Sequence, residues 1–277
     1  MTTATGEPNF KAFERDGWHR QAPHYVDYAD RMTVEAVAPI LETLDARPGM
    51  RLLDVCCGAG YLTAEAVAQG IVATGVDIAP AMVELARSRL PGAEFRIGDA
   101  EALDFGDATF DAVACAFGML HLAEPERAVA EAFRVLRPGG AYAFTVWDGP
   151  ERATLLGIGL QAVTVHADMG VPLPQGPAIF QLADRAHAAA VLGRAGFRDV
   201  AVRDLSLAFR AVRPEDVWDF FEKSTVRTIA VVAQQTPEVQ ARIRAAVVEA
   251  AGRYAGPDSF MIPSPALLFT ARKPNGV

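Results

Sequence analysis

The chain has 277 residues, of which 51% are hydrophobic and 22% charged, and this composition suits one globular α/β domain with insertions. Its formal net charge of −8 and its three lysines disfavour a nucleic-acid partner, because a phosphate backbone requires a basic face. No apolar run is long enough to span a membrane, and the polar start from Met1 to Phe10 has no signal-peptide core, so we expect a cytoplasmic protein.

The three cysteines, Cys56, Cys57 and Cys115, are odd in number, and two of them are adjacent. This arrangement is typical neither of a disulfide framework nor of a zinc site. We therefore expect small buried thiols in a reducing compartment and no bound metal.

The first 45 residues are expected to form a helical lid. Residues 1–20 show no clean period, whereas apolar side chains at helical spacing predict one helix over 25–44. The dipeptide Pro48-Gly49 breaks that helix before the next element begins.

Short apolar runs alternate with helical stretches from residue 51 onward. We expect seven strands, over 51–56, 72–76, 94–97, 110–116, 141–147, 199–209 and 260–271. The helices expected among them span 61–69, 80–90, 125–136 and 184–195. This alternation predicts right-handed crossovers and a Rossmann-like, mostly parallel α/β sheet with helices on both faces. Residues 46–148 would form its ligand-binding core.

The alternation of short apolar runs with helical stretches ends after residue 148. Residues 149–181, with a Gly- and Pro-rich loop at 171–177, and residues 213–257 are expected to be helical insertions that bind the substrate. Residues 182–212 and 258–273 would complete the core sheet. The aromatic side chains expected to wall an apolar substrate pocket are Phe180, Phe209, Trp218, Phe220 and Phe221.

Two glycines, Gly58 and Gly60, follow the first expected strand. Glycine there lets the backbone turn sharply and approach a ligand, and the next helix offers its N-terminal N–H groups. A plain turn between a strand and a helix would show the same pattern. Thr63 stands where a dinucleotide-binding turn requires Gly or Ala, so the pattern disfavours NAD and FAD.

A carboxylate follows each of the next two strands. Asp77 could accept hydrogen bonds from both hydroxyls of a ribose, or it could cap the helix that begins at Pro80. Asp99 could accept a hydrogen bond from the exocyclic amine of an adenine, or it could be a surface loop acid. Because ligands bind at the carboxyl ends of parallel strands, the glycines and the two aspartates together predict an adenosine-containing cofactor.

The run from Leu52 to Trp147 resembles the class I S-adenosylmethionine-dependent methyltransferases, in particular their bacterial small-molecule branch (methyltransferase type 11, or ubiquinone–menaquinone methyltransferase-like). The motifs that carry the resemblance are Leu53–Gly60, Gly75–Met82, Gly98–Glu101, Phe110–Val113 with His121, and Arg134–Gly140. The likeness is weaker through Ala195-Gly196-Phe197 to the end. Cys57 stands where many relatives have glycine or another small residue.

The resemblance implies methyl transfer from S-adenosylmethionine, with S-adenosylhomocysteine as the other product, to O, N or C of a small, partly apolar molecule. The residues that would border the methionine moiety are Gly58, Ala59, Gly60, Ala116 and Phe117. Since in-line displacement from a sulfonium depends chiefly on orientation, a dedicated general base is not obligatory.

The resemblance also implies contacts on the nucleoside side of the cofactor. Asp77 would hold the ribose, and Ile78 and Met82 would pack on the adenine. Asp99 and Ala100 would address the adenine edge.

Three further residues belong to this implied site. Asp54 would orient the glycine loop, and Tyr25 would close the site from the lid, although Tyr25 could equally serve helix packing. His121 is the leading candidate for a general base, and the alternative is that it only shapes the loop after the fourth strand.

Other functions stay open beside the small-molecule methyltransferase. A nicotinamide-dependent oxidoreductase is disfavoured by Thr63 and Asp99, and methylation of RNA or protein by the acidic balance. A non-catalytic, cofactor-binding regulator of the same fold would keep the same motifs. A homodimer is one assembly that the sequence leaves open.

Overall fold

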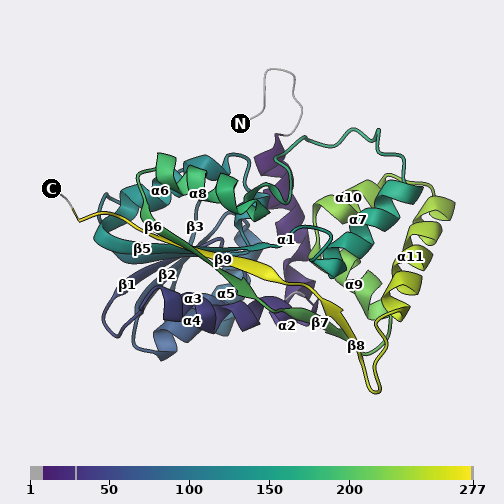
Figure 1. Cartoon of the computed structure of the whole chain (residues 1–277), viewed down its shortest axis with the longest axis horizontal. Coiled ribbons are helices and arrows are strands. Elements are labelled where there is room, and N and C mark those ends of the chain that lie inside the picture. Colours follow the sequence, from purple (N-terminus) through teal and green to yellow (C-terminus); the bar gives the residue numbers. More distant parts are fainter. Residues whose placement is uncertain (1–8, 29, 276–277) are drawn as a thin grey trace.

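The structure is a computed structural model that describes residues 9–28 and 30–275, so the start of the expected lid, residues 1–8, lies outside the described residues. Its main sheet has seven strands in the order β3-β2-β1-β4-β5-β9-β6 (Figure 1). The strands in this order are β3 (Glu94–Ile97), β2 (Val72–Asp77), β1 (Arg51–Val55), β4 (Phe110–Ala116), β5 (Leu136–Trp147), β9 (Ala266–Arg272) and β6 (Arg198–Leu205). All neighbours are parallel except that β9 is antiparallel to both β5 and β6. The predicted seven-stranded, mostly parallel sheet is confirmed.

The order of strands reverses direction at β1, which has β2 on one side and β4 on the other. The pairing of β1 with β2 runs from Arg51↔Val72 to Val55↔Val76, so the two strands end side by side. A parallel sheet of this kind leaves a crevice outside the carboxyl ends of the strands where the order reverses. The segments that follow β1, β2 and β4 therefore meet at one place.

Helices cover both faces of the sheet, as predicted (Figure 1). One face carries α3 (Val37–Thr43), α4 (Tyr61–Ala68) and α5 (Pro80–Arg89), and the other carries α6 (Pro125–Val135) and α8 (Arg185–Arg194). Adjacent residues of β1 point to opposite faces, since a strand has a period of two. Leu52 accordingly joins the apolar core beneath α3 and α4, and Leu53 joins the core beneath α6 and α8.

A second group of helices gathers beside the sheet (Figure 1). These lid helices are α1 (Phe10–Tyr28), α7 (Thr154–His166), α9 (Glu215–Ser224), α10 (Arg227–Ala233) and α11 (Pro237–Gly252). Helix α7 packs on α10 and α11, while α1 packs on both α5 and α9 and so joins the lid to the core. None of the described helices is both long and apolar enough to cross a membrane.

The N-terminal helices differ from the prediction. Helix α1 begins at Phe10, and the expected single helix over 25–44 is divided into the end of α1, α2 (Asp30–Thr33), a 3₁₀ turn η1 (Val34–Ala36) and α3. The buried residues of α1 are Phe10, Glu14, Gly17 and Ala22. Their spacing is helical, but a glutamate and a glycine occupy the buried face, so no apolar period marks this helix in the sequence.

Two expected long strands are each divided. Instead of 199–209 the structure has β6 and β7 (Ala208–Ala211), and instead of 260–271 it has β8 (Phe260–Pro263) and β9. Strands β7 and β8 form a separate two-stranded sheet from which α9 to α11 extend. The break before β9 contains Pro265, which has no N–H to donate to a ladder.

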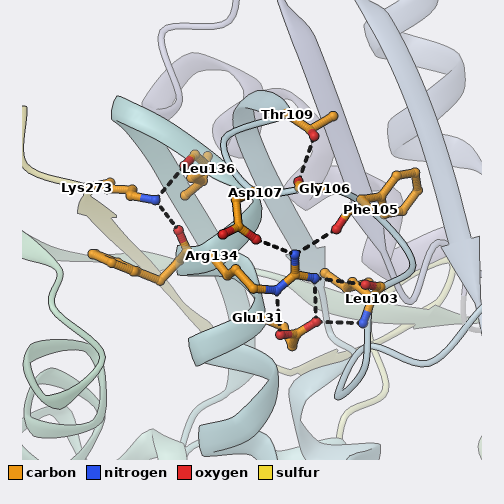
Figure 2. A network of polar contacts seen from close by, with 10 residues as sticks. Leu103, Phe105, Gly106, Asp107, Thr109, Glu131, Arg134, Leu136 and Lys273 are labelled. Carbon is orange, nitrogen blue, oxygen red and sulfur yellow. Dashed lines mark hydrogen bonds and ion pairs between the residues drawn. The ribbon is translucent and has the colours of Figure 1, made fainter. Parts of the chain in front are cut away.

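A polar network fixes the amino end of β4, opposite the end that faces the crevice (Figure 2). The guanidinium of Arg134 donates to the carbonyls of Leu103 and Phe105 and pairs with Glu131 and Asp107. Lys273, just after β9, donates to the carbonyls of Phe133 and Leu136. The Arg134–Gly140 motif is therefore structural here. The residues Leu136–Gly140 of this motif belong to β5, which begins at Leu136 rather than at 141, and its register with β4 shifts between Phe110 and Ala112.

Candidate active site

The loop after β1 has the geometry that its glycines predict. Gly60 has φ +82°, and a Cβ there would lie 2.8 Å from Cζ of Phe95, so both the backbone conformation and the space require glycine. Gly58 has φ +51°, but a Cβ there would meet only Cε1 of Tyr25, at 3.8 Å. The backbone at Gly58 is thus open toward Tyr25, as a ligand-contacting turn needs.

Asp54 lies beneath this loop, 1% exposed. Its Oδ2 accepts hydrogen bonds from the backbone N–H and the hydroxyl of Thr63, at 3.1 and 2.8 Å. Burial raises the pKa of Asp54 to about 7, although the bonds from Thr63 act in the opposite direction. Asp54 thus ties β1 to the first turn of α4, and Thr63 has a structural role that the sequence did not reveal.

Asp77 connects the ends of β1 and β2. Its Oδ2 accepts from the N–H of Gly58 at 3.0 Å, and its Oδ1 accepts from the N–H of Ala79 at 2.9 Å. Burial raises the pKa of Asp77, and the two hydrogen bonds and the nearby His121 offset this only in part. Asp77 therefore fixes the turn that leads into α5, although it does not cap that helix, and it also braces the glycine loop, while its side chain lines the cavity.

A cavity lies at the carboxyl ends of β1, β2 and β4, between the sheet and the lid helices. The predicted site residues that line it are Tyr25, Gly58, Asp77, Ile78, Met82, Ala116, Phe117 and His121. Asp99 and Ala100 line a smaller pocket beside it, which shares Asp77, Ile78 and His121. Asp54 lies under the loop, and Ala59 and Gly60 belong to the loop, but none of these three residues lines either pocket.

Lys11, on α1, contacts the acids expected at the adenine. Its Nζ lies 2.7 Å from Oδ2 of Asp99 and 2.6 Å from Oε2 of Glu101. Glu101 is 1% exposed, and its Oε1 accepts from the backbone N–H groups of Ala123 and Glu124. Partial burial lowers the pKa of Lys11, but the two carboxylates outweigh this and raise it. No pattern in the sequence indicates this contact, because the helix that carries Lys11 shows no apolar period.

A second contact between lid and core involves His121. Its Nδ1 lies 3.0 Å from Oε2 of Glu14 on α1, and the other carboxylate oxygen accepts from Nε of Arg227 on α10, at 2.7 Å. The rings of Trp18 and His121 meet edge to face with centroids 4.8 Å apart. Glu14 and Arg227 were missed by the sequence analysis. Glu14 has helical spacing to Phe10 and Gly17, which becomes visible only once α1 is known.

Most of the lid side of the cavity is apolar. Trp147, at the end of β5, stacks on Phe117 with ring centroids 4.1 Å apart. The other apolar residues here include Leu156, Leu160, Ile179, Phe220 and Phe221. Of the aromatic residues expected to wall the pocket, Phe220 and Phe221 do so. Phe209 and Trp218 are instead buried in the core, and Phe180 packs against it.

Known proteins share sequence with this chain over the part that holds the cavity loops. A family model described as a methyltransferase domain matches residues 53–144. A demethylmenaquinone methyltransferase from Beutenbergia cavernae is 32% identical over 177 residues, which cover 60% of this chain and 73% of that relative. The chain belongs to the class I S-adenosylmethionine-dependent methyltransferases. The chain is also 38% identical over 101 residues to a demethylmenaquinone methyltransferase from Renibacterium salmoninarum, of whose length it covers 43%.

Solved structures share the fold of this chain. The [4+2]-cyclase SpnF superposes with a TM-score of 0.56 at 24% identity, over 88% of this chain and 82% of that one. A putative methyltransferase from Bacillus halodurans gives 0.55 at 19% identity, over 87% and 100%. Since one of these neighbours is named a cyclase, the fold alone does not define the reaction, and the site must.

Proposed function

We propose that this chain binds S-adenosylmethionine in the cavity and transfers its methyl group to a small, uncharged, largely apolar acceptor. The observation that carries the proposal is the hydrogen bond from the N–H of Gly58 to the carboxylate of Asp77. It places an open glycine turn and a carboxylate side by side in one cavity. A turn and an acid at the ends of adjacent strands suit a ligand with a ribose.

The residues present fit the cofactor. Gly58 has room on its cavity side, and Asp77 keeps lone pairs beyond the two hydrogen bonds that it accepts. Ile78 and Met82 give the nucleoside side an apolar surface, and Tyr25 covers the glycine turn. Asp77 would hold the ribose, and Asp99 and Ala100 would lie at the adenine. Gly58, Ala116 and Phe117, which line the cavity, would border the methionine part, while Ala59 and Gly60 would only shape the turn.

The charges around the cavity favour an uncharged acceptor. Glu14 and Arg227 pair with each other, and Asp77 accepts from two backbone N–H groups, so each of these cavity-lining charges is already compensated. The Ser224 hydroxyl is buried at the cavity and has no hydrogen-bond partner among the described residues. An acceptor with one polar atom would satisfy it. The names of the relatives make a quinone-like ring a first compound to test.

His121 is our candidate for the residue that accepts a proton from the acceptor. It lines the cavity, and its Nε2 has no hydrogen-bond partner among the described residues. When bound, S-adenosylmethionine would supply a methyl group on a sulfonium sulfur, ready for in-line displacement. The remaining work falls to the chain: it must orient the two reactants, exclude water through the lid, and hold the proton that leaves.

Titration calorimetry with S-adenosylmethionine and, separately, with NADH tests the cofactor. We expect binding of the first and none of the second, and the reverse result would refute the proposal in favour of an oxidoreductase. Transfer of a labelled methyl group should then be measured to reduced 1,4-naphthoquinone, to simple phenols and to phosphoethanolamine. We expect transfer to the uncharged rings. Cofactor binding with no transfer to any of them would favour a non-catalytic regulator.

A further inference from the structure

Glu14 is a charged side chain in an unusual place for a lid helix. It is 2% exposed and lies at the cavity, where His121 approaches one carboxylate oxygen and Arg227 the other. Arg227 also donates to the carbonyls of Pro177 and Leu120, so the guanidinium is fixed by three segments of the chain. Burial raises the pKa of Glu14, but His121 and Arg227 outweigh it and lower the pKa, so the carboxyl is ionised at neutral pH.

An ionised carboxylate can only accept hydrogen bonds. The 3.0 Å contact between Glu14 and Nδ1 of His121 therefore requires the proton of a neutral imidazole to be on Nδ1. The lone pair is then on Nε2, the nitrogen without a partner among the described residues. The edge-to-face contact with Trp18, at 4.8 Å and 85°, restricts rotation of the same ring.

We propose that Glu14 is a positioning residue that holds His121 in its Nδ1–H tautomer, so that Nε2 accepts the proton of the methyl acceptor. This inference rests on the proposed function. As the acceptor atom bonds to the methyl carbon, the bond between that carbon and the sulfonium sulfur would break with its electron pair going to the sulfur. The acceptor's bond to hydrogen breaks as well and leaves its electron pair on the acceptor. The proton goes to the lone pair of Nε2, and the resulting imidazolium is stabilised by Glu14. This step requires an acceptor that carries an O–H or N–H group before it is methylated. A tertiary amine or a thioether has no such group and would need no base.

A purely structural role for Glu14 gives a different expectation, because the carboxylate also links α1 to α10 through Arg227. The two contacts can be separated by substitution. Glu14→Gln keeps the size of the side chain but removes the charge that fixes the tautomer. Arg227→Lys keeps a cation near Glu14 and removes the hydrogen bonds to Pro177 and Leu120. Glu124→Gln, at a side chain 63% exposed, is the matched control for Glu→Gln on the surface.

The deciding measurement is ¹⁵N NMR of the full chain with labelled histidine and bound S-adenosylhomocysteine, recorded at alkaline pH because only a neutral imidazole has tautomers. The chain has five histidines, and the spectrum of His121→Gln assigns the signal. We expect the Nδ1–H form in the native chain, in Glu124→Gln and in Arg227→Lys, and a shift toward Nε2–H in Glu14→Gln. An Nε2–H form in the native chain, or no change in Glu14→Gln, would overturn the proposal.

Turnover gives a second readout, with whichever acceptor is methylated in the panel above. Glu14→Gln should lower kcat at least about tenfold, a part of the 10² to 10⁴ that a general base supplies, while the Kd of S-adenosylmethionine changes less than about twofold. An unchanged kcat together with a shifted tautomer would also overturn it. If no acceptor is methylated the proposed function fails, whereas the NMR result still decides the role of Glu14. Should Glu14→Gln not fold, the native tautomer decides.

Discussion

Asp77 places both of its carboxylate oxygens on backbone N–H groups, so its replacement should loosen the glycine turn and remove the expected ribose contact together. We expect Asp77→Ala to weaken binding of S-adenosylhomocysteine by about 1–3 kcal/mol, the range for hydrogen bonds to a charged group. Titration calorimetry measures this. Asp104→Ala, at an exposed aspartate, is the control and should leave the affinity unaltered. Equal affinities for both variants would remove Asp77 from the site.

Asp54 links the stability of the chain to pH. Its pKa is about 7 in the folded chain against an ordinary value of 3.8, a difference that corresponds to about 4 kcal/mol. Between these two values the unfolded chain loses the proton while the folded chain keeps it. The contribution of protonated Asp54 to the stability of the fold is therefore complete below about pH 4 and is lost as the pH rises to about 7.

Asp54→Asn has no titrating proton but keeps an oxygen for Thr63. Its free energy of unfolding should fall less between pH 5 and pH 8 than that of the native chain. Urea denaturation at both pH values measures this, with Asp104→Asn as the control. If both variants match the native chain, Asp54 is ionised in the fold and its pKa is not raised.

Sequence alone predicted Asp77 and Asp99 as site residues, because each follows a strand whose apolar run is easily recognised, whereas Asp54 was implied by the family resemblance. Neither route could locate Lys11 or Glu14. These side chains reach the site only through the packing of α1 on α5 and α9, and contacts between distant segments leave no local pattern.

At the scale of elements, the turn between β1 and α4 requires glycine at position 60. Gly60→Ala would place a Cβ 2.8 Å from the Phe95 ring in a left-handed backbone conformation, so we expect a loss of at least about 1 kcal/mol in stability and weaker cofactor binding. Gly193→Ala is the matched control. It lies in α8 with no atom near its Cβ position, and alanine there should stabilise by about 0.5–1 kcal/mol. Urea denaturation distinguishes the two. Equal stability of both variants would contradict the clash.

The elements from β1 to β4 were predicted to within a residue or two, since buried parallel strands read as short apolar runs between helices. The ends of the last two long strands were not. Residues 199–209 and 260–271 each have a strand pattern throughout, although each segment continues beyond the main sheet into a second one. The division into β6 and β7, and into β8 and β9, is therefore visible only in how the strands pair.

For the whole molecule, the cavity lies between the sheet and the lid, and residues of both line it. A ligand there should therefore stabilise both parts. We expect S-adenosylhomocysteine to slow amide hydrogen exchange in residues 56–60, in α1 and in α9, and to leave α8 unchanged. Mass spectrometry of peptic peptides measures this. Protection restricted to residues 56–60 would show that the lid does not respond to the cofactor.

The position of β9 has a consequence for how the chain is made. This strand pairs on both edges, with β5 and with β6, yet β5 ends at Trp147 and β9 begins at Ala266. While the ribosome is adding the residues in between, the outer edge of β5 presents unpaired backbone groups to solvent. A nascent chain that ends between β5 and β9 already contains β1 to β5, the strands around the glycine turn. The rest of the sheet must wait for the strand that closes it, and during that interval the exposed edge is open to a neighbouring polypeptide.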